Sequence, residues 1–93
     1  MEKIKSYIIN AKLIKFTNDK TGELVEITKI KYCRESADTE NSVGYDIFEA
    51  NVRGNVLSKI QNNTMKFVTL GVENVPTNKG YDVRIRELNG QML

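Results

Sequence analysis

The fold of this chain is decided by the stretch from Tyr45 to Asn63, which reads YDIFEANVRGNVLSKIQNN. Its first half, Tyr45 to Arg53, alternates between two sets of side chains and is typical of a β-strand. The strand ends at Gly54, and Asn55 can cap a short helix whose apolar stripe lies between Val56 and Ile60. The stretch therefore predicts one strand followed directly by one short helix.

Strands are also predicted on both sides of this stretch. The remaining segments rich in β-branched and aromatic residues are Ile4 to Phe16, Glu23 to Cys33, Met65 to Val72 and Tyr81 to Leu88. The apolar phase slips within the first segment and again near Thr28-Lys29, which predicts a β-bulge in each of the first two strands. We expect Gly71 to break the fourth strand and Val75 to Gly80 to form the next turn.

Three strands, a short helix and two further strands follow one another in a five-stranded OB barrel, where a helix between strands 3 and 4 plugs one barrel end. Coiled strands with bulges fit such a barrel, because small closed barrels need strongly curved strands. We therefore predict a mostly β, OB-like single domain over residues 1–93. The alternative is another small barrel or roll of SH3-like type, in which the helix is incidental.

Composition and length exclude several classes of function. No apolar run approaches the ~20 residues of a membrane helix, and the N-terminus lacks the apolar core of a signal peptide, so we expect a cytoplasmic protein without membrane contact. The chain has no histidine and one cysteine, Cys33. Zinc sites, histidine-based catalysis and internal disulfides are thereby excluded. No catalytic motif is present, and we expect no enzymatic activity, no cofactor and no metal.

Basic residues alternate with aromatic residues on the predicted strands. Single-stranded nucleic acid requires both types, because cations line the phosphates and flat rings stack with unpaired bases at about 1–3 kcal/mol per base. The net charge of +2 favours anionic partners only slightly. The predicted nucleic-acid-binding residues are Lys20, Lys29, Lys31, Tyr32, Tyr45, Arg53, Lys79, Tyr81, Arg84 and Arg86.

Each of these residues also has a structural interpretation. Phe48, Phe67 and Tyr81 share their strand phase with apolar neighbours, which is more typical of core residues than of a stacking platform. Arg84 and Arg86 alternate with apolar residues, so we expect them to face outward, as solvated arginines also do.

The chain resembles the small single-stranded-DNA-binding proteins of phages and plasmids, of the filamentous-phage gene V type. The similarity lies in a strand ending at Phe16-Thr17, a loop with Gly22, a strand ending at Lys31-Tyr32-Cys33, and the segment Asp82 to Arg86 near the C-terminus. The resemblance implies a homodimer that coats exposed DNA cooperatively during replication or transfer of a mobile element. It also implies contacts with replication or transfer proteins.

On this resemblance, five residues match family positions that touch DNA: Lys20, Val25, Ile27, Tyr32 and Arg84. The predicted hairpin tip carries Asp19 and Glu23 where the family is more basic, so we expect weaker or more salt-sensitive binding. The alternative function is a protein-interaction module, such as an accessory or inhibitor subunit of a phage or conjugative system. An exposed apolar patch would support this alternative.

Overall fold

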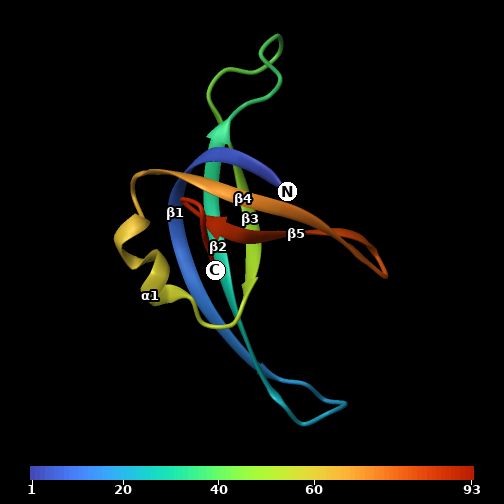
Figure 1. The fold of residues 1–93 in the computed structure, drawn as a ribbon. Coiled ribbons are helices and arrows are strands. Elements are labelled where there is room, and N and C mark those ends of the chain that lie inside the picture. The colour runs from blue at the N-terminus through green and yellow to red at the C-terminus, as the bar shows by residue number, and fades with distance from the viewer.

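The structure, a computed structural model, describes residues 1–93. The elements are β1 (Glu2–Thr17), β2 (Leu24–Glu35), β3 (Tyr45–Arg53), α1 (Leu57–Ile60), the 3-10 helix η1 (Gln61–Asn63), β4 (Phe67–Thr77), β5 (Gly80–Leu88) and β6 (Gln91–Met92). Figure 1 shows the strands wrapped into a barrel, with α1 at its side. The β1–β2 hairpin, the β2–β3 loop and the β4–β5 hairpin project from it in different directions.

Strands β1 to β5 form a closed barrel. β1 pairs with β2 and β4, β2 with β3, and β4 with β5, all antiparallel. A parallel contact between Asn51 of β3 and Arg84 of β5 closes the ring, and β6 adds only two residues beside β5. The prediction of a mostly β, five-stranded, OB-like barrel with one short helix between strands 3 and 4 is confirmed.

One of the two predicted bulges is present. The β1–β2 register shifts between Ile8 and Asn10, so Ile9 is the extra residue in β1. The predicted bulge near Thr28 is wrong, because β2 pairs with β3 without interruption from Ile27 to Glu35. Near this point the β1–β2 hairpin leaves the barrel. Apolar side chains at Val25 and Ile27 therefore stay on the outer face, without any slip of register.

Strand β4 is longer than expected. Gly71 does not break it, and a register shift against β5 occurs at Gly71–Val72 instead. The turn predicted from Val75 to Gly80 is present but shorter, at Asn78 and Lys79, since β4 continues to Thr77 and β5 begins at Gly80. Beyond Val72, β4 pairs with β5 alone. Pro76 is therefore in an edge segment, where its missing N–H breaks no ladder.

Ile60 of helix α1 and Val56, the residue before the helix, are both buried and belong to the core. The segment between β3 and α1 is held in place by Thr28 of β2, which is fully buried. The Thr28 hydroxyl donates to the Gly54 carbonyl at 2.8 Å and accepts the Val56 N–H at 3.1 Å. The Asn55 side chain accepts the Leu57 N–H at 3.2 Å, close to the capping role predicted for it. Neither helical segment has the length and apolar character that crossing a bilayer requires.

The core is a single cluster of eleven side chains inside the barrel: Ile8, Ile30, Tyr32, Ala50, Val52, Val56, Ile60, Val68, Leu70, Ile85 and Leu88. Two aromatic residues that we expected in the core are on the surface instead, since Phe67 and Tyr81 are 49% and 78% exposed. Phe48 has the inward phase of Ala50 and Val52 and stacks on Tyr32, but it remains 39% exposed. In β4 the buried phase is that of Val68 and Leu70, so Phe67 faces outward. The core is thus mostly aliphatic, and most of the rings remain accessible.

Candidate nucleic-acid interface

The outer face of the barrel carries a row of polar side chains that crosses four strands. Lys12 of β1 pairs with Lys29 of β2, Lys29 with Asn51 of β3, and Asn51 with Arg84 of β5. Residues that pair directly across a sheet have side chains on the same face. We call these four residues the basic row. It places three cations on one surface, although they come from distant parts of the sequence.

A cleft of about 290 Å³ opens beside the basic row, between the β1–β2 hairpin and strands β3 and β5. We call it the hairpin cleft, and it is lined by Phe16, Asn18, Val25, Ile27, Asn51, Arg53, Asp82 and Arg84. Phe16 is about half exposed, at 46%. Arg53 and Arg84 take part in none of the six ion pairs of the structure. The cleft therefore combines an exposed ring with two unpaired guanidinium groups.

Two predicted lysines of β2 lie on the same outer face but are paired with one carboxylate. Lys29 and Lys31 place their ammonium groups 3.7 and 3.6 Å from the two oxygens of Glu49. All three side chains are 43–48% exposed. Ion pairs of this kind contribute about 0–1 kcal/mol. A phosphate can therefore replace Glu49 at small cost, and Asp82 is the one acidic side chain inside the hairpin cleft itself.

Four of the predicted binding residues lie outside the basic row and the hairpin cleft. Lys20 is in the β1–β2 turn, where its N–H is bonded to the side chain of Asn18 at 2.9 Å. Lys79 and Tyr81 are at the tip of the β4–β5 hairpin, and both are exposed. Arg86 faces outward as expected, but it donates to Glu73 at 3.0 Å. Arg86 is thus less available to a ligand than Arg84.

Tyr32 requires a correction, because its ring is inside the barrel. It is 3% exposed and stacks on Phe48 with ring centroids 5.7 Å apart. Burial raises the pKa of its hydroxyl, while the Arg34 cation lowers it and the Glu2 carboxylate adds to the rise. A base cannot stack on this ring. The family resemblance that assigned it a DNA contact does not hold at this position.

Tyr45 is on the outer face, 58% exposed, at the end of the wall opposite the hairpin cleft. There it approaches Phe67 of β4, which also contacts Tyr7 of β1. Four residues of this wall were not predicted from the sequence as site residues: Tyr7, Phe67, Phe16 and Lys12. The alternation of Val68 and Leu70 was the signal that could have placed Phe67 outside.

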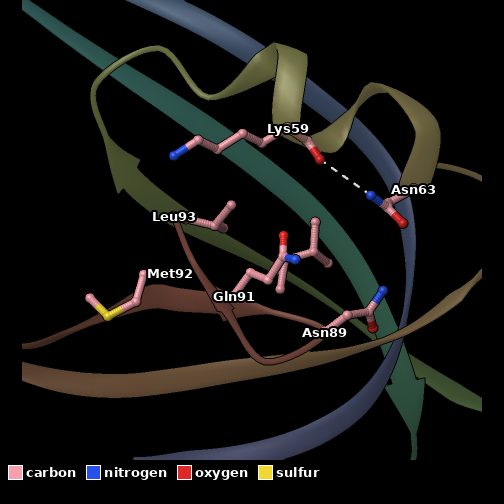
Figure 2. A pocket seen from close by; sticks show the side chains of 7 residues that line it. Lys59, Asn63, Asn89, Gln91, Met92 and Leu93 are labelled. Atoms are coloured by element: carbon pink, nitrogen blue, oxygen red, sulfur yellow. Dashed lines mark hydrogen bonds between the residues drawn. The ribbon is translucent and has the colours of Figure 1, made fainter.

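Not every hollow of the protein combines rings with cations. One of about 440 Å³ lies between α1 and the C-terminal end, lined by Lys59, Asn63, Leu88, Asn89, Gln91, Met92 and Leu93. Figure 2 shows the Asn63 side chain turned to the Lys59 carbonyl, to which it donates at 3.2 Å. No aromatic side chain lines this hollow. Nowhere do three or more histidine, cysteine or acidic side chains gather as metal ligands would.

No protein-family model, curated protein or solved structure matches this chain.

Proposed function

We propose that this protein binds single-stranded nucleic acid, with DNA as the expected ligand, on the outer wall of its barrel. The observation that carries the proposal is the alignment of Lys12, Lys29 and Arg84 in the basic row, next to the exposed ring of Phe16 in the hairpin cleft. Arg53 adds a further unpaired cation. Cations along the backbone and rings under the bases are the two elements that such binding needs.

The position of the charges matters more than their number. Eight of the fourteen lysines and arginines are outside the six ion pairs, and three of those eight are Lys12, Arg53 and Arg84 on this wall. Phosphate contacts release counterions, so affinity for a single strand falls with salt by a slope of about −0.7 for each phosphate neutralised. Binding on this wall is therefore expected to be strongly salt-dependent.

The test is a fluorescence titration of labelled oligo-dT from ~50 to ~200 mM salt. We compare the wild-type protein with Arg84→Ala and with Lys59→Ala, which removes an equal charge from the exposed, unpaired Lys59 on α1. Arg84→Ala should weaken binding and reduce the salt slope by about 0.7. Lys59→Ala should change neither. A duplex and an oligo-U of the same length establish whether the ligand is single-stranded and whether DNA is preferred.

Three results would contradict the proposal. They are no binding at low salt, an affinity that does not change with salt, and an equal loss of affinity in Arg84→Ala and Lys59→Ala. The biological setting, which is the coating of DNA during replication or transfer of a phage or plasmid by a homodimer, rests on the sequence resemblance and stays a prediction.

A protein-interaction module is the second candidate, and one observation favours it. Ile47 and Met65 are 65% and 66% exposed, and Tyr45 and Phe67 join them among the exposed large apolar residues. Exposed apolar patches often mark protein interfaces. A stoichiometric protein partner that survives nuclease treatment in a pull-down would support this function.

A further inference from the structure

Three aromatic rings meet on the outer wall at the end opposite the hairpin cleft. Tyr7 of β1 pairs with Phe67 of β4, and their ring centroids are 5.2 Å apart at an interplanar angle of 70°. Tyr45 of β3 lies 6.3 Å from Phe67 at 53°. We call these three residues the ring cluster. It is separate from the core, because the neighbours of Tyr7, Ser6 and Ile8, are the residues that point inward and are fully buried.

Resting on the proposed function, we propose that the ring cluster is a second base-stacking subsite for the strand held in the hairpin cleft. No two rings of the cluster are stacked in parallel. A base therefore does not have to displace an existing parallel stack. Phe67 and Tyr45 are each about half exposed, so their rings are open to a ligand in the free protein.

A cation accompanies the rings. The Lys5 ammonium group is 5.2 Å from the Phe67 ring centroid and belongs to no ion pair. It is thus placed to contact the phosphate of a nucleotide whose base lies on Phe67. Glu35, which pairs with Tyr45 in the β2–β3 ladder, is a carboxylate on the same face and opposes such binding. Lys5 is therefore an unpaired cation that contacts the ring cluster directly.

A hollow of about 230 Å³ lies directly beside Phe67, lined by Lys5, Phe67, Val68, Thr69 and Asn89. The Asn89 side-chain oxygen accepts the Thr69 N–H at 2.9 Å. Its NH2 group has no acceptor among the side-chain hydrogen bonds of the protein and is free to donate. The hollow therefore offers a ring, a cation and an amide donor to one nucleotide.

These features favour a nucleic acid over a protein on this patch. The centres of protein interfaces are depleted of lysine and other charged residues. Here Lys5 contacts the central ring of the cluster, and Lys66 precedes that ring in the sequence. If the experiment below shows a change of oligomeric state alone, the patch binds a protein instead.

The two subsites are far apart along the wall. Val25 pairs with Phe16 at the hairpin cleft, and Cys33 pairs with Tyr7 at the ring cluster. These β2 residues are 33 − 25 = 8 positions apart, or about 26 Å at ~3.3 Å per residue. OB folds bind ~4–16 nucleotides. Short oligonucleotides are therefore expected to occupy the cleft alone, and longer ones to reach both subsites.

The experiment measures affinity for oligo-dT of ~4 to ~16 nucleotides. The wild-type protein should show a step in affinity at the length that spans both subsites. Phe67→Leu removes the ring but keeps an apolar side chain. It should lower the affinity for long oligonucleotides roughly 5- to 150-fold and leave the affinity for short ones unchanged. Met92→Ala, which truncates an apolar side chain that is 72% exposed on β6, is the matched control and should change neither.

Phe67→Trp provides a direct signal, because the chain contains no tryptophan. Long oligonucleotides should quench its fluorescence and short ones should not, and it should retain the affinity step. Circular dichroism of each variant checks that the barrel has formed.

The inference is overturned if Phe67→Leu binds long oligonucleotides as tightly as the wild type does. It is also overturned if Phe67→Leu changes only the oligomeric state in size-exclusion chromatography, which would make the patch a protein interface. In both cases salt-dependent binding of short oligonucleotides would still support the proposed function. If no oligonucleotide of any length binds, both proposals fail together.

Discussion

The two faces of strand β2 have opposite characters. Its inward residues, Thr28, Ile30 and Tyr32, are all buried, while the outward Lys29 and Lys31 are partly or fully exposed. The inner face closes the barrel with apolar packing and with the hydrogen bonds of the buried Thr28 hydroxyl. The outer face makes no comparable contribution to the core, so its cations and rings are available to bind a ligand. This separation lets substitutions on the two faces affect stability and binding independently.

The largest expected effect is on the inner face. Ile30→Ala removes a fully buried side chain from the core cluster and should lower the free energy of unfolding by about 2–5 kcal/mol. Urea denaturation measures the change. Binding of oligo-dT by the remaining folded protein should equal that of the wild type. A loss of less than ~1 kcal/mol would show that the barrel interior is less tightly packed than this structure indicates.

A smaller loss is expected from the buried hydroxyl. Thr28→Val keeps the shape of the side chain but leaves the Gly54 carbonyl and the Val56 N–H without this partner. The protein should lose about 1–3 kcal/mol of stability in the same assay. Thr69→Val, at an exposed position on β4 with no side-chain hydroxyl bond in the structure, is the control and should cost far less.

On the outer face, Glu49→Gln should strengthen oligo-dT binding. The substitution removes the carboxylate that pairs with both Lys29 and Lys31. Freed from it, the two lysines should raise affinity about fivefold at low salt, which corresponds to roughly 1 kcal/mol. The salt slope should become steeper. Glu40→Gln, in the β2–β3 loop, removes an equal charge away from the wall, and an equal gain from it would mean that only net charge matters.

The smallest effect is a difference in alkaline stability. Burial raises the pKa of Tyr32 in the folded protein above that of the unfolded chain, which is about 10. At alkaline pH the folded state therefore holds the Tyr32 proton more tightly than the unfolded chain does. The stability that this proton contributes is complete below the pKa of the unfolded chain, and it is lost as the pH rises through the pKa of Tyr32 in the folded protein. Wild-type stability should fall above about pH 10 more steeply than that of Tyr32→Phe. Identical pH profiles for the two proteins would contradict this.

Much of the fold could be predicted from sequence, because it depends on local signals. The alternation in Tyr45 to Arg53 gave the bounds of β3 correctly, and Gly54-Asn55 marked the entry to the helix. The errors in predicted register and strand ends fall where a strand extends beyond the barrel and loses one of its neighbours. Val25 and Ile27 suggested a slipped register, and Gly71 and Pro76 suggested a broken strand, because single-strand patterns do not reveal how many neighbours a strand has at each point.

The candidate site was less predictable. Arg53 and Arg84 are brought together only by the β3–β5 closure, and Lys12 joins them only through the β1–β2 pairing. Which aromatic rings are accessible was also beyond the sequence. Tyr32 is buried and Phe67 is exposed, the reverse of the expectation, because the phase of each strand is fixed by its partners in the closed barrel.

The sequence by itself determined the order of strands and helix, and it gave most of the outward cations, since alternation and turn residues act within a few positions of the chain. The tertiary structure alone decided which of those cations are adjacent, which are neutralised by carboxylates, and which rings face outward. These properties depend on register between distant strands. Register is set by burying one continuous aliphatic core, to which every strand contributes only a part.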